Sequence, residues 1–477
     1  MHGMGKERRY FLDYYRNHDA FRSIRGGGTL SDDAGFFRWG EDTICFGRSS
    51  AGARSDRADG SLYDILDDTK LNSAHVALPF DDNEIISNLL YEHYSNSPGK
   101  EPGLSSKIVR SMYYRLRPCL SVSLRKHLQK IYLRKWREIK FPEWPVDCTV
   151  DRIQRRLLAL SMRACSIDSI PFIWFWPDGF ESCAIITHDV EEARGRDFCA
   201  RTIDLDEMYG FQSSYQVVPE CRYEVPTEYL NMIVNRGCEV NVHDLNHDGR
   251  LYSDRQDFLR RAAQINEYGR KFGAVGFRSA ILYRNADWFD SYDFLYDMSI
   301  PNVGHLDPQR GGCCTVMPYF IGELVELPVT CTQDYTLFNV LHDYSTDLWK
   351  RQIGIVMENH GLISMLVHPD YIIETAAQET YKEILRYLAY QRDAGKIWTP
   401  LPKAVAEWWR QRSEMELVCN GGKWRIEGEG RERARIAYAL AAGDTVVYSL
   451  SPTDNHRDES SVAHINWKLS LAGREAI

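Results

Sequence analysis

Between residues 170 and 395, short apolar runs alternate with longer amphipathic stretches. The short runs predict buried strands, and the stretches with apolar residues at helical spacing predict helices between or after them. Such alternation favours a parallel α/β sheet or barrel, whose functional groups lie at the carboxyl ends of the strands. The predicted strands are 183–187, 213–218, 238–242, 274–277, 324–329 and 361–367, and the predicted helices are 257–272 and 375–391.

The regions on either side have other patterns. Before residue 80, short apolar runs such as 35–39 and 43–46 are separated by Gly-rich polar stretches, which predicts strands in a small module. Asp81-Asp82-Asn83-Glu84 is typical of a helix start. Further short runs near the carboxyl end, such as 445–450, predict strands, and the end itself is polar. The predicted segments are a β-containing module at 1–80, a helical basic linker at 81–169, the barrel at 170–400, a small β appendage at 401–450 and a disordered tail at 451–477.

Residues 107–140 are rich in Lys and Arg and contain almost no acids. Leu124, Leu128, Ile131 and Tyr132 fall at helical spacing, which predicts a cationic amphipathic helix. Such a helix can lie on an anionic membrane surface, giving a peripheral membrane contact. It can also pack on its own domain with a solvated basic face, which is the more common arrangement.

Composition narrows the class of protein. A net charge of −9 over 477 residues argues against a general nucleic-acid binder. The 12 cysteines contain no Cys-x-x-Cys pair, so neither a zinc ribbon nor a thioredoxin-type motif is present. No signal peptide and no run of about 20 apolar residues is visible, so we expect a cytoplasmic protein with reduced thiols. The oligomeric state stays undetermined.

The apolar run Ala184 to Ile186 changes abruptly into His188, Asp189 and Glu191. Side chains alternate along a strand, so Asp189 and Glu191 should point to the same side. Two neighbouring carboxylates are costly unless a positive centre lies between them. Taken alone, the stretch is slightly better explained as an ordinary solvated loop.

A positive centre is suggested by His243 and His247, which follow another strand-like run. Four residues apart, they would share a face on one helical turn and could hold one metal ion. Two histidines and one carboxylate leave metal positions open for water and substrate, which is typical of a catalytic site.

Two further polar residues follow predicted strands. Arg278 could orient a carboxylate through a bidentate contact, and His368 could act as a general acid at neutral pH. Taken singly, a surface salt bridge for Arg278 and a core or loop position for His368 are the simpler interpretations.

In their order and content, these four blocks resemble the polysaccharide deacetylase family, carbohydrate esterase family 4. The first block, Thr187-His188-Asp189-Val190-Glu191, is similar to a variant of the family's first motif with one residue between its two acids. The resemblance implies that Asp189 is the catalytic base and Glu191 a metal ligand, with Glu192 as an alternative ligand. His243 and His247 match the second motif as the other ligands.

The remaining motifs are assigned in the same way. Arg278 matches the arginine that positions the base, with Ala280 where the family usually has proline. Leu366 and His368 match the Leu-x-His motif, which implies a substrate contact for Leu366 and the general acid for His368. The family also has an Asp that tunes this histidine, and Asp334 is the first choice for it.

Asp347 is the alternative to Asp334. The resemblance covers about residues 170–395 and implies a distorted (β/α) barrel, flanked here by an N-terminal α+β region and a small C-terminal β appendage. No Gly-x-Ser-x-Gly motif is present, so a serine hydrolase of that type is set aside.

The implied activity is a metal-dependent hydrolase that removes acetyl groups from N-acetylated sugars of a polysaccharide or glycan precursor. The implied cofactor is a divalent metal ion, expected to be Zn²⁺, and the implied partner is a carbohydrate. An O-acetyl esterase or a non-sugar amide hydrolase of the same fold is the first alternative. A non-catalytic protein that binds glycan or assembles other enzymes is the second.

Overall fold

The structure is a computed structural model that describes residues 9–18, 21, 23–72, 75–96 and 133–451. The chain forms two compact units, each assembled from separate segments of the sequence. Unit 1 comprises residues 1–88, 149–180 and 408–477, and unit 2 comprises residues 89–148 and 181–407.

Unit 2 is built on a nine-stranded sheet in the order β12-β13-β11-β10-β9-β8-β7-β14, with β15 paired to β7. Every pair in this sheet is parallel except β12 with β13. Each of the six runs predicted to be strands overlaps one of these strands. The strands are β7 (Ser182–Val190), β8 (Ser214–Val217), β9 (Glu239–His243), β10 (Gly276–Arg278), β11 (Tyr296–Asp297), β12 (Tyr319–Ile321), β13 (Leu324–Glu326), β14 (Leu362–Val367) and β15 (Ile397–Trp398).

The sheet curls into a distorted barrel, because the segment that follows β13 reaches β14. Val329 forms a parallel bridge with Pro301, on the β11 side. The backbone N–H of Cys331 donates to the carbonyl of Ser364, in β14, at 3.3 Å. This irregular segment therefore links the β11 side of the sheet to β14, and the predicted distorted (β/α) barrel is confirmed.

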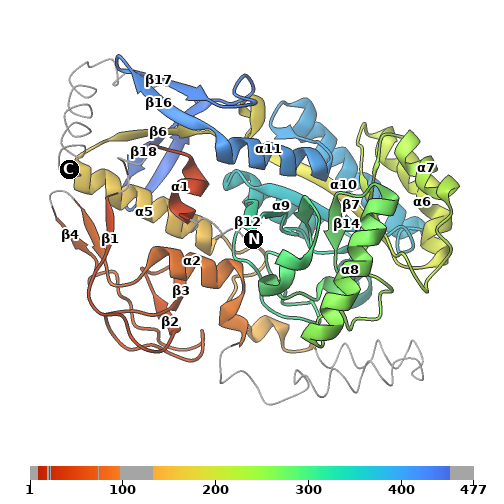
Figure 1. Cartoon of the computed structure of the whole chain (residues 1–477), viewed down its shortest axis with the longest axis horizontal. Helices are drawn as coiled ribbons and strands as arrows, with labels where there is room; N and C mark the ends of the chain where they lie inside the picture. Colours follow the sequence, from red (N-terminus) through yellow and green to blue (C-terminus); the bar gives the residue numbers. More distant parts are fainter. Residues whose placement is uncertain (1–8, 19–20, 22, 73–74, 97–132, 452–477) are drawn as a thin grey trace. The chain divides into compact units, whose positions relative to one another are not determined.

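Helices join the strands of unit 2 (Figure 1). Helix α8 begins after Asp254, whose carboxylate accepts from the backbone N–H groups of Gln256 and Asp257, and it ends at Gly273 with φ +66. It thus starts two residues before the predicted 257–272. Among the described residues, the α-helices with residues in unit 2 are α2 (Asp82–Leu90), which begins in unit 1, α6 (Ala193–Met208), α7 (Thr227–Asn235), α8 (Arg255–Phe272), α9 (Asp347–Glu358), α10 (Thr375–Asp393) and α11 (Pro402–Glu414), which ends in unit 1.

Alternation along β14 separates its two faces. Met365 and Val367 pack in a core cluster with Tyr381 and Leu385 of α10, so they face the helices. Leu366 lies between them and therefore faces the inside of the barrel. The same alternation in β7 sends His188 and Asp189 to opposite faces.

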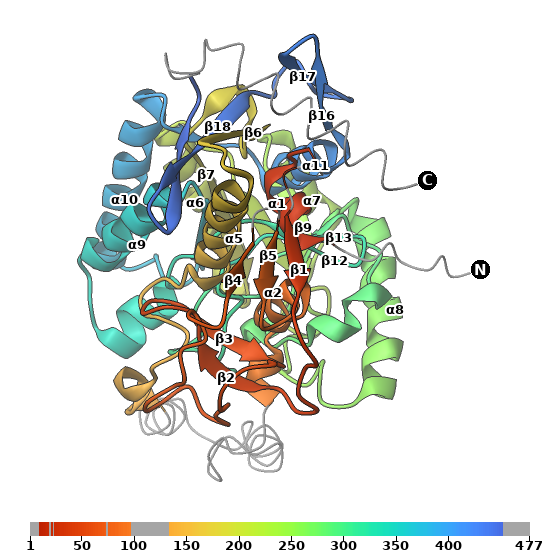
Figure 2. The ribbon, with the colours of Figure 1, turned by 90° about the vertical axis from the view of Figure 1, so that its left-hand side faces the viewer.

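Unit 1 contains smaller sheets. Strand β18 pairs antiparallel with both β19 and β6, and Figure 2 shows β6 beside β18. The predicted run 445–450 contains β19, which pairs with β18, and β18 pairs in turn with residues 169–173, far away in the sequence. The unit 1 elements are α1 (Tyr10–Tyr15), β1 (Ile24–Gly26), β2 (Gly35–Arg38), β3 (Ile44–Gly47), β4 (Lys70–Leu71), β5 (Val76–Leu78), α5 (Thr149–Cys165), β6 (Ser169–Ile173), β16 (Glu416–Asn420), β17 (Lys423–Glu427), β18 (Ile436–Ala442) and β19 (Thr445–Ser449).

Two sequence predictions fall largely outside the described residues. These are the basic helix at 107–140, of which 107–132 are not described, and the tail at 451–477, of which 452–477 are not described. In the part of the chain that is described, none of the helices has the length and apolar character needed to cross a membrane.

Candidate active site

Four parallel strands of the barrel end at the same edge with polar side chains. Strand β7 carries Asp189 and leads into Glu191, β9 ends at His243, β10 ends at Arg278, and β14 leads into His368. In the register of β9 and β10, His243 lies beside Arg278. The structure therefore places these residues together at the carboxyl ends of the strands.

Glu191, His243 and His247 form a compact set of potential metal ligands. One ligand atom from each lies within 4.8 Å of the others. Glu191 Oε1 is 2.9 Å from His247 Nε2 and 3.9 Å from His243 Nε2. Both Nε2 atoms are buried and have no hydrogen-bond partner among the described residues. Unbonded imidazole nitrogens facing a carboxylate are costly unless a cation joins them, so the residues fit a divalent metal such as zinc.

The path between the two histidines differs from the predicted helical turn. His243 ends β9, and the chain then passes through left-handed conformations at Asp244 and His247, each with φ 56. The pairing of β9 with β10 fixes His243, and its Nδ1 donates to the Arg278 carbonyl at 3.1 Å. That bond leaves Nε2 of His243 as the ligand atom.

Glu191 rather than Glu192 faces this cluster. Burial by itself would raise the pKa of Glu191, but the imidazoles of His247, His243 and His368 hold it well below its usual range. Glu192 instead accepts from Arg222 Nη2 at 2.7 Å, and its side chain is 53% exposed.

Asp189 is buried beside a fully buried arginine. Arg278 Nη1 donates to Asp189 Oδ1 at 2.7 Å and to Thr187 Oγ1 at 2.9 Å, while its Nε donates to the Met298 carbonyl at 2.8 Å. The contact with Asp189 therefore uses one nitrogen and is not the expected bidentate contact, since Nε bonds the neighbouring backbone. Asp189 Oδ2 remains on the side of the cluster, 3.6 Å from His243 Nε2.

The charge state of Asp189 follows from these neighbours. Burial alone would raise the pKa of this carboxyl. The guanidinium of Arg278 and the imidazoles of His243 and His368 outweigh burial and hold the pKa below its usual value. Asp189 is thus an ionised carboxylate, able to accept a proton.

His368 is bonded to Asp334 at two points. Asp334 Oδ1 accepts from His368 Nδ1 at 2.6 Å, and Oδ2 accepts from the His368 backbone N–H at 2.8 Å. Burial would lower the pKa of His368, but Asp334 raises it well above its usual value. His368 Nε2 lies 3.5 Å from Glu191 Oε1, on the side of the cluster. The alternative Asp347 is exposed at the start of α9.

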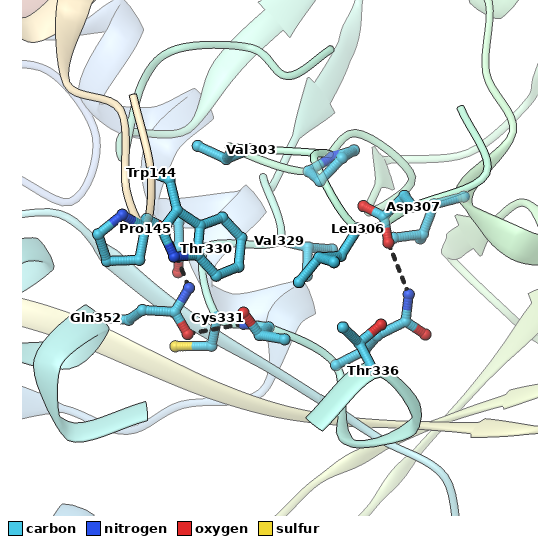
Figure 3. A pocket seen from close by; sticks show the side chains of 14 residues that line it. Trp144, Pro145, Val303, Leu306, Asp307, Val329, Thr330, Cys331, Thr336 and Gln352 are labelled. Carbon is cyan, nitrogen blue, oxygen red and sulfur yellow. Dashed lines mark hydrogen bonds between the residues drawn. The ribbon is translucent and has the colours of Figure 1, made fainter. Parts of the chain in front are cut away.

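An apolar surface lies beside these polar groups. Leu366 packs with Leu282 and Val329 in a separate buried cluster. Leu282 and Val329 also line a pocket, which Figure 3 shows with the indole of Trp144 beside Val329 and with Asp307 on its polar side. Through Val329, the pocket adjoins the inner face of the barrel near Leu366.

The two residues that directly precede Asp189, Thr187 and His188, received no role in the sequence prediction. The hydroxyl of Thr187 accepts from Arg278 and donates to the Met365 carbonyl at 2.7 Å. His188 is fully buried on the other face of β7. The alternation of side chains along the predicted strand could have indicated the role of His188. A histidine inside a strand that is buried on both faces must find polar partners there.

No family model and no curated protein matches this chain. Solved structures match about half of it. A proposed polysaccharide deacetylase from Mycobacterium smegmatis matches with 17% identity, 52% coverage of this chain, 96% coverage of its own and a TM-score of 0.41. A second proposed polysaccharide deacetylase, from Pseudomonas aeruginosa PAO1, matches with 14% identity, coverages of 49% and 93% and a TM-score of 0.40. The allantoinase Puue matches with 13% identity, coverages of 49% and 92% and a TM-score of 0.39.

Proposed function

We propose that this protein is a metal-dependent hydrolase that removes acetyl groups from N-acetylated sugars of a polysaccharide or glycan precursor. One observation carries the proposal. The set Glu191, His243 and His247 lies within 3.6 Å of an ionised carboxylate, Asp189, and within 3.5 Å of a histidine with raised pKa, His368. A metal site flanked by a base and an acid is the arrangement needed to hydrolyse an unreactive acyl bond.

Glu191, His243 and His247 are the residues that would hold the ion. Their one carboxylate and two imidazole nitrogens are ligands typical of catalytic zinc. When bound, a divalent ion there would polarise an acyl carbonyl and make a water molecule more acidic.

Asp189 is the proposed general base. Arg278 holds Oδ1 through a 2.7 Å hydrogen bond, so Oδ2 is the atom left to take a proton from water. Oδ2 is also the carboxylate oxygen close to the ligand cluster, 3.6 Å from His243 Nε2. Since Arg278 is itself bonded to Thr187 and the Met298 carbonyl, the carboxylate is held in one orientation.

His368 is the proposed general acid. Its Nδ1–H is committed to Asp334, so the proton it can donate is the one on Nε2. Because Asp334 raises the pKa of His368, the imidazole retains that proton. Given to the departing nitrogen, this proton would let the sugar leave as an amine. Leu366, on the inner face of β14, is the residue we propose to contact the acyl group.

The test is acetate release from a panel of N-acetylated sugars by zinc-loaded protein. A matched panel of O-acetylated sugars separates amide from ester hydrolysis, and simple N-acetyl amines test the non-sugar alternative. The expected result is release from N-acetyl sugars that disappears in Glu191→Gln. Absence of release from every substrate by protein that binds zinc would refute the hydrolase and favour the non-catalytic glycan-binding alternative.

A further inference from the structure

The outer face of β7 carries a buried polar network that the proposed reaction does not use. Its centre is His188, which is fully buried. In the sequence, His188 lies between Thr187, which bonds Arg278, and Asp189, the proposed base. Three other buried residues lie around it, namely Asp206 from α6, Tyr381 from α10, and Ser213. In Figure 1, α6 and α10 are labelled near β7.

Both ring nitrogens of His188 face acceptors. Nδ1 lies 3.1 Å from the Val367 carbonyl, and since a carbonyl only accepts, Nδ1 carries the hydrogen. Nε2 lies 2.9 Å from Asp206 Oδ2. Asp206 also accepts from Ser213 Oγ at 2.6 Å and from the Tyr381 hydroxyl. These three partners fix the carboxylate, and the carboxylate fixes the imidazole ring.

The bond to Val367 links the two strands that carry the proposed base and acid. His188 directly precedes Asp189, and Val367 directly precedes His368. His188 and Val367 are also the last register pair of the ladder between β7 and β14. The end of a ladder is where strands separate most easily. A side-chain bond at that pair resists separation at the point where Asp189 and His368 leave the sheet.

The inner face has a matching bond. Thr187, whose register partner is Leu366, donates through Oγ1 to the carbonyl of the preceding residue, Met365, at 2.7 Å. Side chains of the successive residues Thr187 and His188 therefore join strands β7 and β14, one on each face of the sheet. The inner bond belongs to the Arg278 network, whereas the outer one belongs to the network of His188 and Asp206.

We infer that His188, oriented by Asp206 and Tyr381, is a positioning residue that fixes Asp189 relative to His368. The inference rests on the proposed function, because it assigns to those two residues one shared reaction. A displacement of about 1 Å between reacting groups can cost on the order of 10²-fold in rate. The network would affect turnover while leaving the ligands Glu191, His243 and His247 in place.

Three variants form a matched set. His188→Phe keeps a ring that can stack on Tyr215, whose ring centroid lies 4.8 Å away, but removes both hydrogen bonds. Tyr381→Phe removes only the hydroxyl, which donates to Asp206 and lies 3.4 Å from His188 Nε2, so it tests the network if the first variant folds poorly. Tyr215→Phe is the control, because the Tyr215 hydroxyl is buried near His188 but makes no hydrogen bond with the described residues.

Turnover number, KM and zinc affinity are to be measured for all three variants with the full chain well below its melting temperature. We expect kcat to fall by roughly 10²-fold in His188→Phe and about tenfold in Tyr381→Phe, with near wild-type values in Tyr215→Phe. KM and zinc affinity should stay near wild type throughout. A network that only stabilises the fold would lower the melting temperature and leave kcat of the folded protein unchanged.

Hydrogen exchange gives a second measurement that needs no substrate. Amides of residues 362–370 should exchange faster in His188→Phe than in wild type or Tyr215→Phe. If His188→Phe and Tyr381→Phe match Tyr215→Phe in kcat, or if their loss of kcat follows a loss of zinc, the positioning role is refuted. If the wild-type protein releases no acyl group, the proposed function is refuted instead. Unchanged amide exchange in His188→Phe would then also refute the link between β7 and β14.

Discussion

Asp189 and Glu191 are close in sequence and space, yet the proposed mechanism gives them opposite responses to the same substitution. In Asp189→Asn, the amide oxygen can still accept the hydrogen bond that Arg278 Nη1 makes at 2.7 Å, so the side chain should stay in place. The amide cannot take a proton from water. Loss of a general base costs about 10²–10⁴ in rate, and kcat should fall by that factor.

Zinc affinity should respond differently. Asp189 Oδ2 is 3.6 Å from His243 Nε2, whereas Glu191 Oε1 is 2.9 Å from His247 Nε2 and belongs to the compact ligand set. Asp189→Asn should therefore bind zinc nearly as wild type does. Glu191→Gln loses a charged ligand, and the loss should exceed the 10–100-fold seen when residues one step further from a metal are changed.

The assay is calorimetric titration of chelator-stripped protein with zinc, followed by acetate release at saturating zinc. Asp189→Asn leaves the buried Arg278 without its ionised partner, and breaking a buried pair completely costs about 3–5 kcal/mol. The melting temperature should be checked for that reason. Loss of zinc in Asp189→Asn with retention in Glu191→Gln would mean that the two roles are exchanged. Full turnover in Asp189→Asn would remove Asp189 as the base.

Three further predictions concern other parts of unit 2. Asp334 accepts from both His368 Nδ1 and the His368 backbone N–H, whereas an amide has only one oxygen. Asp334→Asn should therefore lower kcat by about 10–100-fold with zinc affinity near wild type. Unchanged kcat in steady-state assays would contradict the pairing. Zinc at 100 times its dissociation constant should stabilise wild type against urea by about 2.7 kcal/mol relative to chelator-treated protein. The same concentration should not stabilise Glu191→Gln. Equal stability of wild type with and without zinc would argue against the site. Burial raises the pKa of Asp307 from 3.8 to about 6, so the folded state favours the protonated carboxyl and this contribution is lost as pH rises from about 4 to about 6. At 1.36 kcal/mol per unit the loss is about 3 kcal/mol at most, and urea unfolding across this pH range should show a smaller decrease for Asp307→Asn than for wild type; identical pH dependence would refute it.

Much of the barrel was determined by local sequence pattern. Apolar runs predicted the strands because a strand buried on both faces needs continuous apolar residues, and each predicted run overlaps a strand. Polar residues directly after such runs marked strand ends, which is why Asp189, Glu191, His243 and His368 could be named before their positions were known. The alternation of side chains also separates His188 from Asp189, although the sequence alone gave His188 no role.

The tertiary structure decided which residues meet. The single-nitrogen contact of Arg278 with Asp189 depends on the Met298 carbonyl, and the path from His243 to His247 depends on left-handed backbone and not on a helical turn. In the same way, the pairing of residues 169–173 with 436–442 in unit 1 joins segments with no shared local pattern. Local patterns specify which residues are buried and which way they point, because these depend on neighbours in sequence. Distances between catalytic groups depend on the order and register of the strands, which are set by contacts between residues far apart in the chain.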